Sequence, residues 1–249
     1  MSGHNKWSSI KHKKAAVDAK RGKIFTRLIR EITISAKEGG GDPEGNARLR
    51  TAINAARAAN MPSKNIENAI KRGTGELEGA QFVEVIYEGY GPGGVAIIVH
   101  TSTDNTNRTA SEVRHAFSKH NGNLGAMGCV SYLFHRKGII QIEAAKTTED
   151  KLMEIVLDAG AEDIQLDGDT FTVTTQPSDL EKVREAIQKA GIEIMSAESK
   201  LIPQTTTRVE AKEAEQCLRL LAHLDDLDDV SSVSANFEMD DAILERFAQ

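Results

Sequence analysis

Residues 138–174 read GIIQIEAAKTTEDKLMEIVLDAGAEDIQLDGDTFTVT, and the succession of patterns in this stretch decides the fold class. Short apolar or β-branched runs alternate with a longer run of helical periodicity, and Asp167-Gly168-Asp169 marks a tight turn. The expected strands and helices lie, in order, at 138–143, 148–159, 163–166, 170–174, 179–190 and 193–199. The order βαββαβ predicts a ferredoxin-like sandwich over residues 136–202.

The segments on either side of this unit complete each other. Upstream, the pattern predicts two strands joined by Gly91-Pro92-Gly93-Gly94, then a helix and a strand; downstream, it predicts one helix and one strand. These elements are expected at 82–90, 95–100, 107–120, 129–134, 210–224 and 230–237. The upstream ββαβ piece lacks one helix of a balanced two-layer unit. We therefore expect one discontinuous domain, residues 79–135 and 203–249, with 136–202 inserted.

Residues 1–78 show a third pattern, short helices separated by glycine. Helices are expected at 23–37, at 46–59 and from Pro62 to Gly73, and Gly39-Gly40-Gly41-Asp42-Pro43 ends the first of them. The predicted fold is therefore α+β and multidomain. It has an N-terminal three-helix domain plus two α/β sandwich domains, one of them ferredoxin-like and inserted in the other.

The composition is that of a globular chain. Of 249 residues, 27% are charged and 39% are hydrophobic. No apolar run approaches the roughly 18 residues of a membrane helix, and the N-terminus lacks the apolar stretch of a secretory signal. Cys129 and Cys217 are too few for a disulfide framework, so we interpret them as free thiols. We expect a cytoplasmic protein with no membrane contact.

Charge is distributed very unevenly along the chain. The net charge is −6, yet residues 1–75 hold 16 basic and six acidic side chains, a balance of +10, and the remainder holds 15 basic and 31 acidic, a balance of −16. Such asymmetry points to a segment that binds a polyanion. The alternative is that the basic part docks on the acidic part of the same chain.

The densest basic segment begins at Lys6 and continues onto one face of the helix expected at 23–37. Each such side chain can neutralise a phosphate whatever the base sequence. Trp7, the single tryptophan, can stack on an unpaired base, although burial is the commoner fate of a lone tryptophan. The candidate nucleic-acid-binding residues are Lys6, Trp7, Lys11, His12, Lys13, Lys14, Lys20, Arg21, Lys23, Arg27 and Arg30.

A second candidate lies between a strand and a helix. Asp104, Asn105, Asn107 and Arg108 combine helix-capping side chains with an arginine, so they could bind an anion at the helix start. Plain capping explains the first three equally well.

The sequence carries no pattern typical of an enzyme or a metal site. The seven histidines have no metal-ligand spacing with cysteine or carboxylates, and His115 and His120 fall off a common helix face. A strand follows Gly89–Gly94, so this segment is a turn and not a nucleotide loop. The run Asp225–Asp229 lacks the glycine and spacing of a calcium loop and is interpreted as a solvated turn. We expect no catalytic residue, no metal and no cofactor.

Several segments together resemble the YebC/PmpR family, and the resemblance runs along essentially the whole chain. They are Gly3-His4-Asn5-Lys6-Trp7, Ile10-Lys11-His12-Lys13-Lys14, Lys20-Arg21-Gly22-Lys23, Gly39-Gly40-Gly41-Asp42-Pro43, Tyr87-Glu88-Gly89-Tyr90-Gly91-Pro92-Gly93-Gly94, Asp104-Asn105 with Asn107-Arg108-Thr109, and Val113-Arg114 with Phe117 and Lys119. Asn121 stands where the family usually has a glycine. The resemblance implies a three-domain cytoplasmic protein without known catalysis.

The resemblance leaves two functions open. Some family members are described as DNA-binding transcriptional regulators. Others are translation factors that act at the ribosome, including on proline-rich stretches, and a mitochondrial relative is a translational activator of cytochrome c oxidase. The first hypothesis is a DNA-binding transcriptional regulator, and the alternative is a factor that binds rRNA or the ribosome. A small-ligand sensor built on residues 136–202 is a third hypothesis, supported by fold analogy alone. The sequence shows no dimer seam, so a monomer is plausible.

Overall fold

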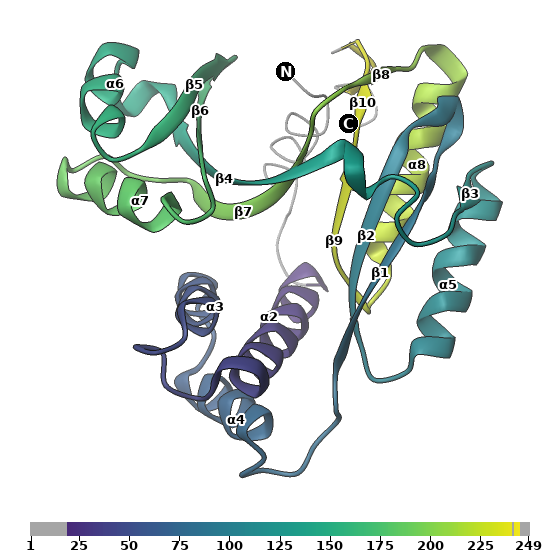
Figure 1. Cartoon of the computed structure of the whole chain (residues 1–249), viewed down its shortest axis with the longest axis horizontal. Helices are drawn as coiled ribbons and strands as arrows, with labels where there is room; N and C mark the ends of the chain where they lie inside the picture. The colour runs from purple at the N-terminus through teal and green to yellow at the C-terminus, as the bar shows by residue number, and fades with distance from the viewer. Residues whose placement is uncertain (1–18, 241, 245–249) are drawn as a thin grey trace. The chain divides into compact units, whose positions relative to one another are not determined.

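The computed structural model describes residues 19–240 and 242–244 (Figure 1). Its contacts divide the described residues into two compact units, one reaching to Ser131 and continuing from Thr206, the other Tyr132–Thr205. Helices and predominantly antiparallel sheets are combined in the α+β manner, and the second unit interrupts the first in sequence. The predicted fold class is confirmed. The domain boundaries proposed at 78/79, 135/136 and 202/203 remain predictions.

Three helices of the first unit pack together as the apolar spacing requires. They are α2 Ala19–Gly39, α3 Ala47–Ala58 and α4 Ser63–Thr74. Ile32, Leu49, Ala56 and Ala69 are buried in their shared core. The Asn46 side chain caps α3 by accepting the Leu49 N–H. Each helix falls where the sequence predicts it, and α2 begins four residues earlier than expected.

Most of the rest of the first unit is a four-stranded antiparallel sheet with two helices on one face, and residues 207–208 and 237–238 form a separate short parallel pair. The sheet has the order β3-β1-β2-β9. Ile97 and Val99 alternate along β2 toward a core that contains Phe117 of α5 and Leu218 of α8. The elements are β1 Val83–Tyr90, η1 Pro92–Gly94, β2 Ala96–Thr103, α5 Thr106–Lys119, β3 Asn123–Leu124, η2 Ser131–Leu133, β8 Thr207–Arg208, α8 Ala211–Asp226, β9 Val230–Ala235 and β10 Phe237–Glu238.

The second unit has the strand order of a ferredoxin-like sandwich. Its sheet runs β5-β6-β4-β7 with antiparallel neighbours, and Ile140, Leu152 and Val183 are buried together in its core. The elements are β4 Phe134–Glu143, η3 Ala144–Lys146, α6 Glu149–Leu157, β5 Ala161–Asp167, β6 Thr170–Thr175, α7 Leu180–Lys189 and β7 Ser196–Pro203. The last strand begins three residues later than predicted.

The strand predicted at 129–134 is wrong, and a buried carboxylate explains why. Glu88 is 4% exposed and accepts the N–H groups of Gly128, Val130 and Ser131 at 2.8–2.9 Å. These amides therefore hold a loop and do not extend a ladder. Burial alone would raise the pKa of Glu88, but the three N–H bonds outweigh it and lower the pKa. The strand that pairs with β1 here is the short β3.

Replacing Gly89 by alanine should destabilise the first unit. A Cβ at this position would lie 2.5 Å from the Asn123 carbonyl oxygen and 2.9 Å from the Phe117 ring. We expect a loss of about 1–3 kcal/mol in the free energy of unfolding, measured by urea denaturation. Gly22→Ala in α2, where nothing lies within 4 Å of the added Cβ, is the control and should stabilise by up to about 1 kcal/mol. Equal stability of the Gly89→Ala variant and the unsubstituted protein would contradict the packing described.

Candidate nucleic-acid interface

The basic face predicted on α2 is present and largely covered. Lys23, Arg27 and Arg30 stand four and three residues apart, so they share one side of the helix. Their side chains are only 22%, 24% and 13% exposed. The covering segment is Asp225–Asp229, the last two residues of α8 and the turn that precedes β9, which we call the acidic loop.

Lys23 and Arg27 contact the first part of the acidic loop. The Lys23 Nζ donates to the Asp225 carbonyl oxygen at 2.7 Å and lies 3.5 Å from the Asp226 carboxylate. Arg27 donates to the same carbonyl oxygen and lies 3.4 Å from the Asp225 carboxylate. The carbonyls of a last helical turn have no partner within the helix. These two cations therefore cap the negative end of α8.

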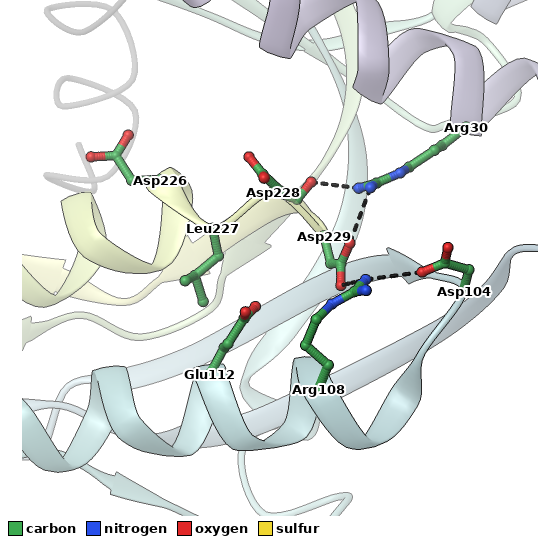
Figure 2. Close-up of a pocket in the computed structure, with 8 residues that line it drawn as sticks. All are labelled: Arg30, Asp104, Arg108, Glu112, Asp226, Leu227, Asp228 and Asp229. Atoms are coloured by element: carbon green, nitrogen blue, oxygen red, sulfur yellow. Dashed lines mark hydrogen bonds and ion pairs between the residues drawn. The ribbon is translucent and has the colours of Figure 1, made fainter.

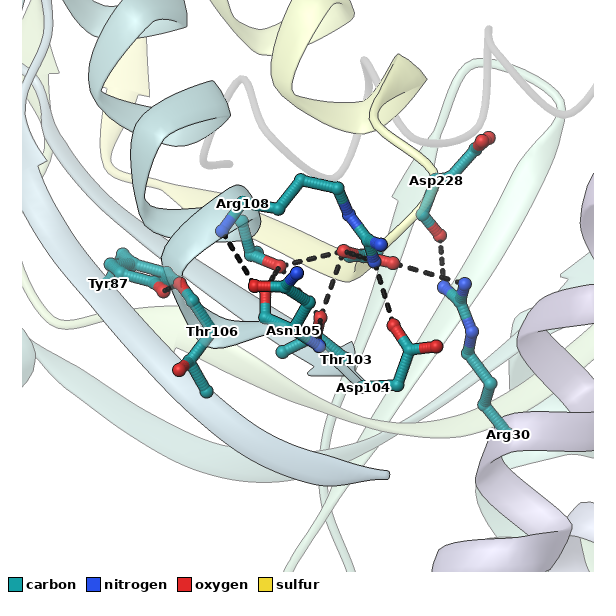
Figure 3. Close-up of polar contacts among 10 residues, drawn as sticks. Arg30, Tyr87, Thr103, Asp104, Asn105, Thr106, Arg108 and Asp228 are labelled. Carbon is teal, nitrogen blue, oxygen red and sulfur yellow. Dashed lines mark hydrogen bonds and ion pairs between the residues drawn. The ribbon is translucent and has the colours of Figure 1, made fainter. Parts of the chain in front are cut away.

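Asp229 is the centre of a polar network. Figure 3 shows how the labelled residues of this network lie: Arg30, Thr103, Asp104, Asn105, Arg108 and Asp228. The Asp229 carboxylate is 2% exposed, and one oxygen accepts from the hydroxyls of Thr103 at 3.0 Å and Thr109 at 2.7 Å and from the Arg108 guanidinium at 2.7 Å. The other oxygen lies 3.1 Å from Arg30, which also donates to the Asp228 carbonyl. Burial would raise the pKa of Asp229, but these hydrogen bonds outweigh it and lower the pKa, so the group stays ionised.

The second candidate site is built around this same carboxylate. Asn105 caps α5 by accepting the Arg108 N–H at 3.1 Å, as plain capping predicts. The Arg108 guanidinium binds Asp104 at 2.9 Å and Asp229 at 2.7 Å, and both carboxylates raise its pKa. Asn107 is exposed in the first turn. The anion that Arg108 binds here is thus a carboxylate of the chain itself, and binding of an external anion stays a prediction.

An open pocket of about 490 Å³ lies where these elements meet (Figure 2). Its lining carries five carboxylates and two guanidinium groups, an excess of negative charge, together with a single leucine. The lining residues are Arg30, Asp104, Arg108, Glu112, Asp226, Leu227, Asp228 and Asp229.

Two histidine rings lie close together in the first unit. His120 Nε2 and His223 Nδ1 lie 3.1 Å apart, and burial lowers the pKa of both rings. Within residues 19–240 and 242–244, no group of three histidine, cysteine or acidic side chains is placed to hold a metal ion. Burial raises the pKa of Cys217 to about 12 and also raises that of Cys129, which disfavours both thiolates.

The structure does not describe the side chains of the remaining candidate nucleic-acid-binding residues. Lys6, Trp7, Lys11, His12, Lys13, Lys14, Lys20 and Arg21 lie outside the residues whose side chains are described. Arg48 is used internally, binding Glu31, Glu38 and Glu84. Further exposed cations of the helical part are Lys37, Arg57, Lys64, Lys71 and Arg72. Over the described part of the chain, no helix is long and apolar enough to cross a membrane.

Sequence reasoning missed the partner of the α2 face. The prediction of a solvated turn at 225–229 is wrong for Asp225 and Asp229, which are 18% and 2% exposed, and holds for Asp226, which is 82% exposed. A signal was available in the sequence. Four acids within five positions match three cations at helical spacing, and the charge balance already allowed docking within the chain. The pairing of His120 with His223 required the packing of α5 on α8 and had no comparable signal.

The fold and this site define a class of multidomain α+β protein in which a basic helical domain precedes two α/β domains. Comparison with known proteins gives the family. A model described as the TACO1/YebC protein N-terminal domain matches residues 5–76, and one described as the TACO1/YebC second and third domain matches residues 82–237. The chain belongs to the TACO1/YebC family.

Relatives match over nearly their whole length. A protein of Desulfosudis oleivorans named "Probable transcriptional regulatory protein" is 56% identical, covering 98% of this chain and 99% of the relative. A protein of Geobacter sulfurreducens with the same description is 54% identical, covering 99% of each. The crystal structure of a conserved hypothetical protein, Aq1575 from Aquifex aeolicus, has a TM-score of 0.84 at 52% identity, covering 91% of this chain and 94% of that one.

The buried charge of Asp229 should dominate the stability of this site. Asp229→Asn removes a carboxylate that two guanidiniums and two hydroxyls bind, so we expect the free energy of unfolding to fall by about 3 kcal/mol at pH 7. Because the pKa of Asp229 is lowered in the folded state, its contribution is present above the unfolded value near 3.9 and lost as the pH falls. The variant should therefore lose less stability than the unsubstituted protein on acidification below that pH.

The matched control is Asp226→Asn, whose side chain is 82% exposed and which should change stability by less than about 0.5 kcal/mol. Urea denaturation between pH 3 and pH 7 measures both variants. Equal effects of the two substitutions would show that Asp229 is not the centre of the network.

Proposed function

We propose that this chain is a non-enzymatic regulator of gene expression that binds a nucleic-acid backbone through its basic N-terminal domain. The observation that carries the proposal is the charge balance of +10 in residues 1–75 against −16 in the rest. Lys23, Arg27 and Arg30 extend this charge onto an ordered helix face. Phosphate neutralisation by such a surface gives affinity without sequence reading. The acidic body limits unspecific association, and the protein acts in the cytoplasm.

A DNA-binding transcriptional regulator is the leading form of this proposal. The curated relatives carry the name of transcriptional regulators, and this supports the assignment. A factor that binds rRNA or the ribosome in translation is the second candidate. Base reading needs side chains such as Asn, Gln and Arg placed for a groove, and the candidate segment is instead rich in lysine, which suits recognition of backbone and shape. A small-ligand sensor would use the ferredoxin-like unit, and only fold analogy supports it.

Charge reversal in the N-terminal segment should abolish nucleic-acid binding. With six to ten phosphate contacts, affinity for duplex DNA or structured RNA should fall about 10³- to 10⁵-fold between 50 and 200 mM salt. Changing Lys11, Lys13 and Lys14 together to glutamate should remove most of the affinity at 50 mM salt, measured by fluorescence anisotropy. The charge-matched control changes Lys151, Lys182 and Lys189, exposed on the helices of the ferredoxin-like unit. A flat salt dependence, or equal loss in both triple variants, would refute the proposal.

The two forms of the proposal differ in the nucleic acid that the protein contacts in the cell. Ultraviolet crosslinking in cells, followed by sequencing of the attached nucleic acid, separates them. A transcriptional regulator should recover promoter DNA, and a translation factor should recover ribosomal RNA. The variant with glutamate at positions 11, 13 and 14 serves as the background control and should recover neither. Predominant recovery of ribosomal RNA would overturn the transcriptional form.

A further inference from the structure

The contact between α2 and the acidic loop uses the same donors that a phosphate backbone would use. Lys23, Arg27 and Arg30 direct their N–H groups at oxygen atoms of residues 225–229. A donor that is engaged by a carboxylate or a carbonyl cannot also bind a phosphate. Resting on the proposed function, we infer that the acidic loop is an internal competitor of nucleic acid, which holds the α2 face until a polyanion displaces it.

The acidic loop has a fixed part, Asp229, and an outer part, Asp225 and Asp226. Asp229 is buried and keeps three partners from its own α/β layer, the hydroxyls of Thr103 and Thr109 and the guanidinium of Arg108. Its charge therefore stays paired if α2 moves away. Release of the helix would leave no unpaired buried carboxylate, which is the usual obstacle to breaking a buried ion pair.

The outer part is the one that a polyanion can displace. Asp226 is 82% exposed, and the side chains of Lys23 and Arg27 are roughly a quarter exposed. The Lys23–Asp226 pair has an exposed carboxylate, so it contributes little net stability and weakens further with salt. The Arg27–Asp225 pair is more buried, with Asp225 only 18% exposed, so a stronger ligand has to replace it. Phosphates bind arginine with two parallel hydrogen bonds and carry more charge density along a strand than two aspartates do. The exchange of partners at Lys23 and Arg27 is therefore within reach of a nucleic acid.

Arg30 provides a hinge between the state in which α2 contacts the acidic loop and the state in which the N-terminal end of α2 is released. Its guanidinium lies 5.4 Å from the centre of the Phe82 ring, immediately before β1, in addition to its contacts with Asp228 and Asp229. This cation–π contact ties the middle of α2 to the segment that leads into the sheet. The N-terminal end of the helix, with Lys23 and Arg27, can separate while Arg30 stays in place.

The functional consequence is selectivity. A binding face that is occupied internally has its apparent affinity reduced by the fraction of molecules in which it is open. A ligand that contacts only the exposed cations gains nothing from opening, whereas a long polyanion gains Lys23 and Arg27 as well. The loop thus penalises weak, short or unspecific polyanions relative to the proper target.

Neutralising the outer part of the loop tests this inference. The variant Asp225→Asn with Asp226→Asn should bind a 30-nucleotide duplex or structured RNA about three- to tenfold more tightly at 50 mM salt, by anisotropy. The control carries the same charge change on exposed residues of the other unit, Glu154→Gln with Asp158→Asn, and should gain less than twofold. Circular dichroism verifies that each variant is folded.

Repeating the loop substitutions in a protein that lacks the cations of Lys23 and Arg27 distinguishes competition for these cations from a general electrostatic effect. With Lys23→Gln and Arg27→Gln already in place, Asp225→Asn with Asp226→Asn should raise the affinity for nucleic acid no more than the control does. The reason is that the loop has lost the cations for which it competes. Equal gains in the loop variant and the control, or an undiminished gain in this background, overturn the inference while the proposed function stands. If neither the unsubstituted protein nor any variant binds nucleic acid at 50 mM salt, the proposed function fails and the inference fails with it.

Discussion

The carboxylate of Asp229 imposes the constraint on which the first unit depends. A charge that is 2% exposed must be paired and hydrogen-bonded, or it would be forced to take up a proton. Its partners come from the end of β2, the first turn of α5 and the middle of α2. One side chain thereby fixes the start of β9 against three other elements. Asp229 is the last residue of the acidic loop, so fixing its carboxylate also fixes one end of that loop.

This constraint explains how a chain with opposite charges in its two parts can be a stable molecule. The basic α2 face and the acidic loop screen each other where they meet, and Arg48 makes a similar connection from α3 to Glu84 of β1. The exposed cations Lys37, Arg57, Lys64, Lys71 and Arg72 leave the helical part with positive charge on its surface. Internal pairing and the proposed polyanion binding would therefore be two uses of one charge asymmetry.

Periodicity predicted most of the fold because most elements obey it. Alternating strands and helical stripes located the N-terminal helices, the hairpin at Gly91–Gly94, the βαββαβ unit and the last helix and strand. Completion of the layer served only to assign that last helix and strand to the upstream domain. The failures have physical causes. Glu88 binds three backbone amides at 128–131, and such a side-chain-to-backbone clamp leaves no periodic trace. The register of β7 on β4 is set by pairing between strands far apart in sequence, so its start could not be read locally.

The candidate site was predictable in part. The cations of α2 were found from their spacing and Asn105 from its position before a helix, since both signals are local. The burial of Asp229 was not, because it depends on Thr103, Thr109 and Arg108 converging from two other elements. A run of acids looks solvated in sequence unless its partners are known. The family relationship indicates a class of activity only through the names of relatives, and it leaves the chemistry of the interface to these residues.

The central claim is that the α2 face exchanges the acidic loop for nucleic acid. A distance measurement between spin labels at Thr26→Cys on α2 and Arg219→Cys on α8, both exposed positions, tests it directly in a variant whose Cys129 and Cys217 are replaced by serine and alanine. Without nucleic acid, the account predicts a single narrow distance distribution at low salt. Saturating nucleic acid should lengthen and broaden it. An unchanged distribution at saturation would mean that binding leaves the contact intact and would contradict the account.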